Sequence, residues 1–568
     1  MSDAVAVAPV EMPEELTDAS SGPFVVPQAA VVPPHPVVLH RPGSVLDAKL
    51  RKSSPGKAGL AIFILVLLAG LAYIVTRVTA DLQTVHPTSI LPFIELGIAL
   101  LVALGFEFVN GFNDTANAVA TVIYTHSLDP HIAVVWSGCW NFLGVLTASG
   151  AVAYTIVNLL PVGLILKVST GSGFAMVFAL LFAAIIWNLM TWFYGLPISS
   201  SHTMIGSIIG VGIMNQILLG RSGISGIDWE QARKIFKTLL ISPVVGFAGA
   251  ALLFLLLKAF VHDKRLYETP KDGQPPPPFI RALLILTCTG VSFFHGSNDG
   301  QKGMGLIMLI LIGTVPTAYA LNHTFGPNQV QTFIVASEAA IHSLEPTAPP
   351  ATTPAVANPS AELEAFVSSH QYKPTTAVAL QQMASTIERE AAEYKTLAAV
   401  PAAMQANVRN QMYLESESLR LLPKFGPTIT SSDAAVLTTY RAQLDKSTRF
   451  IPTWVKVAVA LALGMGTMIG WRRIVITVGE RIGKAHLTYA QGLTAELVAM
   501  CTIWAAGTYG LPVSTTHVLS SGVAGTMAAN KSGLQRSTIR NIAMAWVFTL
   551  PAAACLSAVL YWLFSKAA

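Results

Sequence analysis

The two stretches that decide the fold are Gly111-Phe-Asn-Asp-Thr-Ala-Asn117 and Tyr194-Gly-Leu-Pro-Ile-Ser-Ser-Ser-His202, because each has a counterpart later in the chain. The first corresponds to Gly296-Ser-Asn-Asp-Gly-Gln-Lys302 and the second to Tyr509-Gly-Leu-Pro-Val-Ser-Thr-Thr-His517. The members of the first pair are 185 residues apart and those of the second are 315 apart. The difference is almost the length of the polar stretch 322–450. The sequence therefore predicts a duplication whose second copy carries an insert.

The composition around these motifs is that of a membrane protein. Only 11% of the 568 residues are charged and 52% are hydrophobic, whereas an ordinary soluble domain has about 25% charged residues. This excludes a soluble enzyme, a nucleic-acid-binding protein and a disordered scaffold. The apolar stretches predict an all-α polytopic membrane protein with two inverted repeats, broken or re-entrant helices and about 10–13 crossings.

The positions of Lys and Arg predict the orientation, because cytoplasmic loops are enriched in them. Basic residues precede the stretch 58–76, lie in the linker 261–280, and follow the apolar stretch 452–470. With the linker inside and the insert outside, each repeat crosses an odd number of times and the repeats are inverted. The basic loop 220–237 is the one loop that disagrees. The predicted parts are a disordered cytoplasmic tail (1–55), an extra transmembrane helix (56–80), repeat 1 (88–260), the cytoplasmic linker (261–280), repeat 2 (281–321 and 451–568) and a soluble, periplasmic insert (322–450).

The first motif places a carboxylate inside each half of the membrane region. Charged residues in membrane helices are costly, and they face a bundle interior or a cavity. Asn and Asp supply hard oxygen ligands that suit a proton or a small cation. The predicted cation-side residues are Asn113, Asp114 and Asn117 in the first half and Asn298 and Asp299 in the second.

The second motif predicts an anion site. Gly and Pro interrupt a helix, and the hydroxyl residues that follow are good caps for the next one. A half-helix that starts there directs free N–H groups and its positive dipole end towards the interior. Paired broken helices of this kind indicate a transporter's central site. The predicted ligands are Ser199, Ser200, Ser201, Ser514, Thr515 and Thr516, and His202 and His517 are either proton carriers or packing residues.

An anion pocket beside a cation or proton site is what an anion symporter requires, because the coupling charge offsets the anion's desolvation. The sequence shows no nucleophile–base pair and no metal-ligand spacing, and its four cysteines lack a CxxC pattern. We therefore predict no enzyme, no cofactor, no metal site and no nucleic-acid partner.

At these residues the chain resembles the inorganic phosphate transporter (PiT) family, and most closely its bacterial low-affinity branch. The matching stretches are 111–124, 185–188, both Gly-Leu-Pro-x-Ser motifs, 294–303, 466–473 and 546–551, and the likeness covers roughly residues 88–565. The resemblance implies two inverted repeats in a homodimer in a bacterial inner membrane. It also implies that phosphate is held between the repeats by the Asn-Asp pairs and hydroxyl clusters named above.

The chain departs from the family pattern at two places. Sodium-coupled members have the pattern Asn-Asp-x-x-Asn-Ala in both halves. In the second half of this chain, Lys302 and Gly303 stand where that pattern has its second Asn and its Ala. An ammonium disfavours sodium binding at that position, so we expect proton symport rather than sodium symport. The resemblance to the bacterial branch also implies that phosphate is carried as a neutral metal–hydrogenphosphate complex. Glu107 is a further candidate for the coupling proton. The second departure is the tail and the helix that precede repeat 1.

Two other functions remain open. A symporter for another tetrahedral oxyanion, above all sulfate, would use the same hydroxyls and helix ends. A transport-dead membrane phosphate sensor would signal through the insert, although it could lose its coupling acids without penalty, and here both are present.

Overall fold

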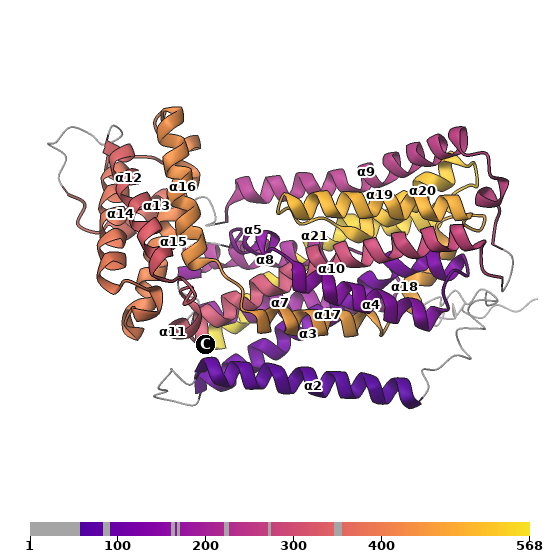
Figure 1. The fold of residues 1–568 in the computed structure, drawn as a ribbon, viewed down its shortest axis with the longest axis horizontal. Coiled ribbons are helices and arrows are strands. Elements are labelled where there is room, and N and C mark those ends of the chain that lie inside the picture. The colour runs from indigo at the N-terminus through magenta and orange to yellow at the C-terminus, as the bar shows by residue number, and fades with distance from the viewer. Residues whose placement is uncertain are drawn as a thin grey trace, which may run out of the picture. The chain divides into compact units, whose positions relative to one another are not determined.

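The computed structural model describes residues 57–82, 91–160, 165–166, 171–220, 227–270, 274–345 and 355–567, which form an all-helical fold (Figure 1). The predicted tail 1–55 lies outside these residues. Apart from one isolated bridge, between Gly483 and Leu534, the described residues contain no β-structure. The helices outside the insert are α2 (Lys57–Leu82), α3 (Leu91–Tyr124), α4 (Pro130–Thr147), α5 (Ala151–Val157), α7 (Gly171–Phe193), α8 (Ser200–Leu218), α9 (Trp229–Phe260), α10 (Pro278–Thr314), α17 (Thr453–Thr467), α19 (Tyr489–Thr508), α20 (Thr515–Ala529) and α21 (Arg536–Ala567).

Shorter elements connect these helices, and a helical insert separates α10 from α17. The short elements are η1 (Lys264–Tyr267), α11 (Pro316–Tyr319), η3 (Leu397–Ala399), α18 (Arg472–Ile476) and the π-helix η4 (Thr477–Arg481). The insert contains α12 (Pro327–Leu344), α13 (Pro359–Ser369), α14 (Pro374–Tyr394), α15 (Ala402–Phe425) and α16 (Ser431–Thr448).

The helix lengths confirm the membrane-protein class. Six described helices are long and apolar enough to cross a bilayer, and eight do so if each of two bent pairs counts as one span. The bends are 76° between α4 and α5 and 73° between α16 and α17. The expected number of about 10–13 crossings, which includes broken and less apolar helices, stays a prediction.

The two Gly-Leu-Pro motifs break the chain in the same way. Gly195 and Gly510 have φ values of +65° and +64°, a conformation that glycine adopts without the Cβ clash of other residues. Each break is followed by a hydroxyl cap: the side chain of Ser199 accepts a hydrogen bond from the N–H of His202, and that of Ser514 accepts one from His517. Helix α8 begins at Ser200 and α20 begins at Thr515, the residues that follow these caps. The prediction that the hydroxyl clusters start new helices is therefore confirmed.

Close contacts between the repeats form reciprocal pairs. A Cβ added at Gly144 on α4 would lie 2.0 Å from the carbonyl oxygen of Phe293, and one at Gly296 on α10 would lie 2.1 Å from that of Asn141. The same exchange joins α3 to α17. A Cβ at Gly111 would lie 2.4 Å from Leu463 O, and one at Gly466 would lie 2.1 Å from Phe108 O. Gly111 and Gly296 are the first residues of the duplicated motif, so corresponding positions make corresponding contacts.

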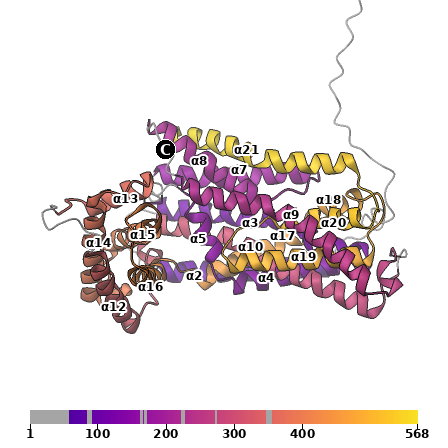
Figure 2. The ribbon, with the colours of Figure 1, turned by 90° about the horizontal axis from the view of Figure 1, so that it is seen from above.

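The capped helices also pack across the repeats. Helix α8 of repeat 1 lies along α21 of repeat 2 (Figure 2), and α20 of repeat 2 lies along α9 of repeat 1. Both partner helices contain an internal proline, Pro243 in α9 and Pro551 in α21. Each half-helix is therefore supported by a long helix of the other repeat.

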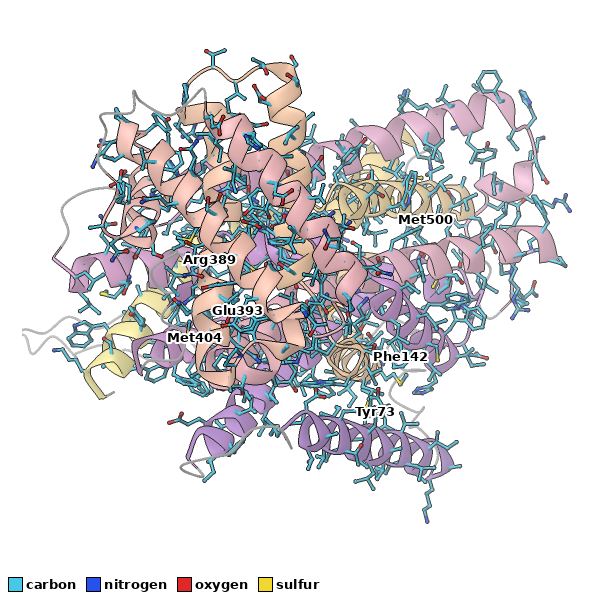
Figure 3. All side chains as sticks on the ribbon, turned by 60° about the vertical axis from the view of Figure 1, so that its left-hand side comes forward. Tyr73, Phe142, Arg389, Glu393, Met404 and Met500 are labelled. Carbon is cyan, nitrogen blue, oxygen red and sulfur yellow. The ribbon has the colours of Figure 1, made fainter. Side chains whose placement is uncertain are left out.

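The insert helices have their own buried core and contact the membrane part through ion pairs. Arg420 on α15 lies 2.7 Å from Asp228, the N-cap of α9, and Lys424 pairs with Glu230. Figure 3 shows the side chains of the insert, with Arg389 and Glu393 on α14 and Met404 on α15. The sequence predicted this segment as a separate insert but named none of these pairs.

Candidate functional site

Asp114 lies where the two half-helices begin. Its Oδ2 accepts a hydrogen bond of 3.0 Å from Ser200 Oγ on α8, and its Oδ1 accepts one from Thr516 Oγ1 on α20. Asn117, one turn along α3, donates from Nδ2 to Asp114 Oδ1 over 2.9 Å and to Thr516 Oγ1 over 2.9 Å. One carboxylate thus joins α3 to hydroxyls from both halves of the chain.

Asp299, the duplicate of Asp114, has a different partner. Its Oδ1 lies 2.7 Å from Nζ of Lys302, one turn further along α10. Lys302 also donates a 2.5 Å hydrogen bond to Ser201 Oγ, and Ser201 donates in turn to the carbonyl of Val513 over 3.0 Å. The side chain of Lys302 has no exposed surface and that of Asp299 is 2% exposed, so the structure places a compensated charge pair in the interior.

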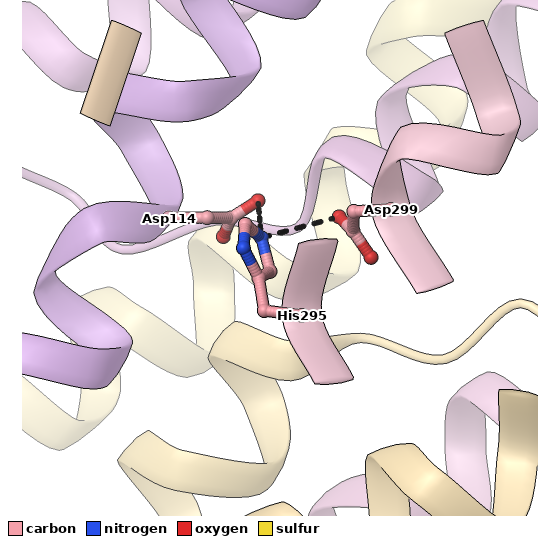
Figure 4. Close-up of side chains that lie close together, drawn as sticks. All are labelled: Asp114, His295 and Asp299. Atoms are coloured by element: carbon pink, nitrogen blue, oxygen red, sulfur yellow. Dashed lines mark ion pairs between the residues drawn. The ribbon is translucent and has the colours of Figure 1, made fainter. Parts of the chain in front are cut away.

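His295 joins the two acids (Figure 4). Its Nε2 lies 3.7 Å from Asp114 Oδ2 and 3.7 Å from Asp299 Oδ2, and its Nδ1 lies 2.8 Å from Asn141 Oδ1. The ligand atoms of Asp114, His295 and Asp299 all lie within 4.8 Å of one another. One imidazole nitrogen and two carboxylate oxygens suit a divalent transition metal as well as a proton. This triplet differs from the expectation of no metal site, because Asp114 is distant in sequence from the pair His295 and Asp299.

His295 is the main residue that the sequence reasoning missed. It lies inside the matching stretch 294–303 and precedes Asp299 by four residues, so both side chains lie on one face of α10. That spacing was the available signal. Its connection to Asp114 could not be read from the sequence, because it depends on how α3 and α10 pack.

The starts of α8 and α20 face this cluster of charges. The N–H groups of the first helical residues have no intrahelical acceptor, and the caps take up only those of His202 and His517. Ser200 and Ser201 lie in the first turn of α8, and Thr515 and Thr516 lie in that of α20. Two convergent helix starts with their hydroxyls form a site whose partial charge favours an anion.

The two asparagines that precede the acids bond to backbone rather than to the carboxylates. Asn113 Nδ2 donates to the carbonyl of Asn188 over 3.4 Å, and Asn298 Nδ2 donates to that of Leu511 over 3.1 Å. Their Oδ1 atoms are buried without a hydrogen bond in the described part of the chain. Asn113 therefore ties α3 to α7, whereas Asn298 ties α10 to the break that precedes α20.

The rings of the two motif histidines contact each other in a tilted arrangement. The ring centroids of His202 and His517 are 4.5 Å apart, and His517 stacks on Trp546 at 4.0 Å. Trp546 Nε1 donates to the carbonyl of Pro197 over 2.9 Å, within the first of the two Gly-Leu-Pro motifs. Of the two interpretations left open by the sequence, this geometry favours packing.

Two further carboxylates, those of Glu107 and Glu496, are buried among the helices outside the insert. Glu107 lies on α3 seven residues before Asp114, about 10 Å along the helix, and its carboxyl packs on Gly303 of α10. Glu496 on α19 accepts a 2.5 Å hydrogen bond from Thr287, and the sequence reasoning did not single it out. Its signal was the only acid in the apolar stretch 487–528.

The family model and the curated relatives agree on one family. The model of the phosphate transporter family matches residues 110–557. The low-affinity inorganic phosphate transporter PitA of Escherichia coli strain K12 is 43% identical over 494 residues, covering 83% of this chain and 97% of that protein. PitB of the same strain is 42% identical with the same coverage. A solved structure titled "The sodium-dependent phosphate transporter" covers 83% of this chain and 99% of its own, with a TM-score of 0.46 and 20% identity.

Proposed function

Because the chain belongs to the phosphate transporter family, we propose that it imports inorganic phosphate across the bacterial inner membrane by symport with a proton. One observation carries this proposal. The carboxylate of Asp114 accepts hydrogen bonds from Ser200 and Thr516. The helix starts that we propose as the anion site therefore lie next to a buried acid.

The coupling follows from the charge of this place. With His295 neutral, Asp114 and Asp299 carry two negative charges and Lys302 carries one positive charge, so the cluster is formally negative. A phosphate anion entering beside it would add uncompensated charge to a buried site, which is strongly unfavourable. A bound cation or proton removes that penalty. Phosphate and the coupling ion therefore bind together or leave together.

The position of Lys302 favours a proton over sodium. Its ammonium already lies 2.7 Å from Asp299 Oδ1, so the second acid is compensated without a free cation. Asp114 and His295 then remain without an ammonium partner, and an imidazole is the side chain that ordinarily takes up a proton near neutral pH. The same pair with Asp299 offers ligands for a divalent metal, which would travel as cargo with hydrogenphosphate.

The architecture that we propose has the two repeats inverted in the membrane, with the linker 261–280 in the cytoplasm and the insert on the periplasmic side. The reciprocal glycine contacts support the relation between the repeats. We also propose a homodimer, as in the family pattern. The extra helix α2 would place the N-terminus on the cytoplasmic side.

Uptake in proteoliposomes tests the function and the coupling together. The full chain is reconstituted, the membrane potential is clamped, and pH and sodium gradients are imposed independently. We expect phosphate to accumulate when the outside is acidic, and not when only sodium is higher outside. Accumulation driven by sodium at equal pH would refute proton coupling, and the absence of any phosphate uptake would favour the sensor.

Competition between phosphate and sulfate during uptake distinguishes a phosphate symporter from a sulfate symporter. Both are tetrahedral oxyanions, but only hydrogenphosphate carries a proton donor at neutral pH that can bond to a carboxylate such as Asp114. Sulfate at a concentration equal to that of phosphate should leave phosphate uptake unchanged. Equal inhibition by unlabelled sulfate and unlabelled phosphate would assign the chain to a broader oxyanion symporter.

A further inference from the structure

A basic pocket lies at the end of α20 and the start of α21, away from the acids and hydroxyls described above. It is open to the surface, has a volume of about 610 Å³, and contains four cationic side chains among its lining residues: Lys484, Lys531, Arg536 and Arg540. The other lining residues are small or apolar, namely Ala528, Gly533, Leu534, Ile539 and Ala543. No acidic residue lines it.

The local backbone holds these cations together. The N–H of Lys484 donates to the carbonyl of Gly533 over 3.0 Å, beside the bridge between Gly483 and Leu534. Gln535 donates from Nε2 to the carbonyl of Gly483 over 2.7 Å. The loop before α19 is thereby fixed against the turn that starts α21, and its lysine faces the same pocket as the arginines.

The four cations of the basic pocket form no ion pair within the described part of the chain. Arg536 and Arg540 are four residues apart on one helix, a spacing at which like charges repel. Such a grouping is stabilised by an anion that several cations share.

The pocket also borders a surface suited to hydrocarbon chains. Along α21, one and two turns beyond Arg540, the apolar side chains of Met544, Val547 and Phe548 are 49%, 70% and 55% exposed. A molecule with an anionic head in the pocket would have its apolar part on this face. Free phosphate would use only the head position and leave the apolar face unexplained.

The basic pocket is far from the proposed transport site around Asp114. Ala528, which lines the basic pocket, is twelve residues beyond Thr516 on α20, about 18 Å along the helix axis. The positive-inside pattern of the sequence, which includes Lys484, puts this end of the molecule at the cytoplasmic face. Anionic lipids are attracted to basic groups at that face.

We propose that the basic pocket binds the headgroup of an anionic phospholipid of the inner leaflet, with the acyl chains along α21. Four cations favour a headgroup with two phosphates, such as diphosphatidylglycerol, over one with a single phosphate. The bound lipid would hold α21, which supports α8, and so would stabilise the helix whose start contacts Asp114.

Lipid retention on the full chain tests this proposal. The protein is purified in mild detergent with diphosphatidylglycerol, phosphatidylglycerol or phosphatidylcholine, and bound lipid is counted by native mass spectrometry. The wild type should retain diphosphatidylglycerol best and phosphatidylcholine least. The double variant Arg536→Ala/Arg540→Ala should weaken retention of diphosphatidylglycerol by about thirtyfold, the effect of two interfacial cations.

The matched control is Lys258→Ala/Lys264→Ala, which removes two exposed cations from another part of the predicted cytoplasmic side and should retain the lipid as the wild type does. Equal retention of anionic and zwitterionic lipids by the wild type, or unchanged retention by the arginine variant, would overturn the proposal. So would displacement of the lipid by inorganic phosphate at equal concentration, because the pocket would then be a free-anion site. If the arginine variant fails to fold, loss of the lipid from the wild type at high salt carries the same decision.

Discussion

Lys302 Nζ lies between Asp299 Oδ1, at 2.7 Å, and Ser201 Oγ, at 2.5 Å, so a single ammonium joins the second acid to the start of the first half-helix. The contact crosses the repeats, since Lys302 belongs to α10 and Ser201 to α8. In the other direction, Asp114 of repeat 1 accepts from Thr516 of repeat 2. Each repeat therefore supplies a charged group to the helix start of the other.

The ion pair predicts the effect of removing Lys302. Lys302→Met would leave Asp299 as an uncompensated buried charge, and breaking a buried pair in this way costs about 3–5 kcal/mol. Thermal unfolding in detergent should show a lower melting temperature, and phosphate uptake should be lost. The double variant Asp299→Asn/Lys302→Met should recover most of the stability without recovering uptake. Wild-type stability of the single variant would contradict the buried pair.

The hydrogen bond from Thr516 to Asp114, one of three that the carboxylate accepts, predicts a graded effect at Thr516. Thr516→Val removes the hydroxyl but keeps the shape, so Asp114 loses a charge-assisted bond worth about 1.5–3 kcal/mol. Uptake should fall at least tenfold. Thr516→Ser, the matched control, keeps the hydroxyl and should remain close to wild type. Equal activity of the two variants would exclude a role for the hydroxyl.

Asp114 itself should be indispensable for transport while dispensable for insertion. Asp114→Asn keeps the size of the side chain but removes the charge that binds the coupling proton. We expect no phosphate accumulation in proteoliposomes and normal amounts of protein in the membrane fraction. Asp299→Asn should also abolish uptake while the protein still inserts, but with a lower melting temperature, because Lys302 loses its buried partner. Normal transport by both variants would discard the site assignment.

The reciprocal glycine contacts predict where an added methyl group is not tolerated. In Gly144→Ala the new Cβ would lie 2.0 Å from Phe293 O, so α4 and α10 would have to separate. The melting temperature should fall by several degrees, since overpacking costs about 1–3 kcal/mol. Gly97→Ala on α3 is the control, because nothing lies within 4 Å of its added Cβ. That variant should be neutral or slightly stabilised, and an equal loss in both would contradict the contact.

Glu415 predicts a pH-dependent stability of the insert. Burial raises the pKa of its carboxyl well above the ordinary value, and neither oxygen has a hydrogen bond in the described residues. A raised pKa in the folded state gives stability that is full below about pH 4.5 and is lost as pH rises through the folded pKa. Each pKa unit is worth about 1.4 kcal/mol.

Replacing this carboxyl tests the assignment. Glu415→Gln cannot ionise, so limited proteolysis of its insert at pH 8 should be slower than in the wild type, with little difference at pH 5. The exposed Glu393 on α14 (Figure 3) provides the control Glu393→Gln, which should follow the wild type at both pH values. A wild-type insert that is equally resistant at both pH values would argue against a buried, raised carboxyl.

The sequence allowed much of this site to be predicted, because its signals are local. The acids, the caps at Ser199 and Ser514 and the starts of α8 and α20 all follow from short motifs whose duplication marks them. His295 and its contact with Asn141 were missed because they depend on the packing of α10 against α4. The contact between the rings of His202 and His517 likewise depends on tertiary packing that no local motif shows. The topology rests on the distribution of Lys and Arg alone and stays a prediction.

A density map of the full chain with phosphate bound tests the central claim most directly. The account predicts phosphate between the first turns of α8 and α20, within hydrogen-bond distance of hydroxyls from both clusters and next to Asp114. Phosphate density at another place, or helix starts that lie apart and face lipid, would contradict it.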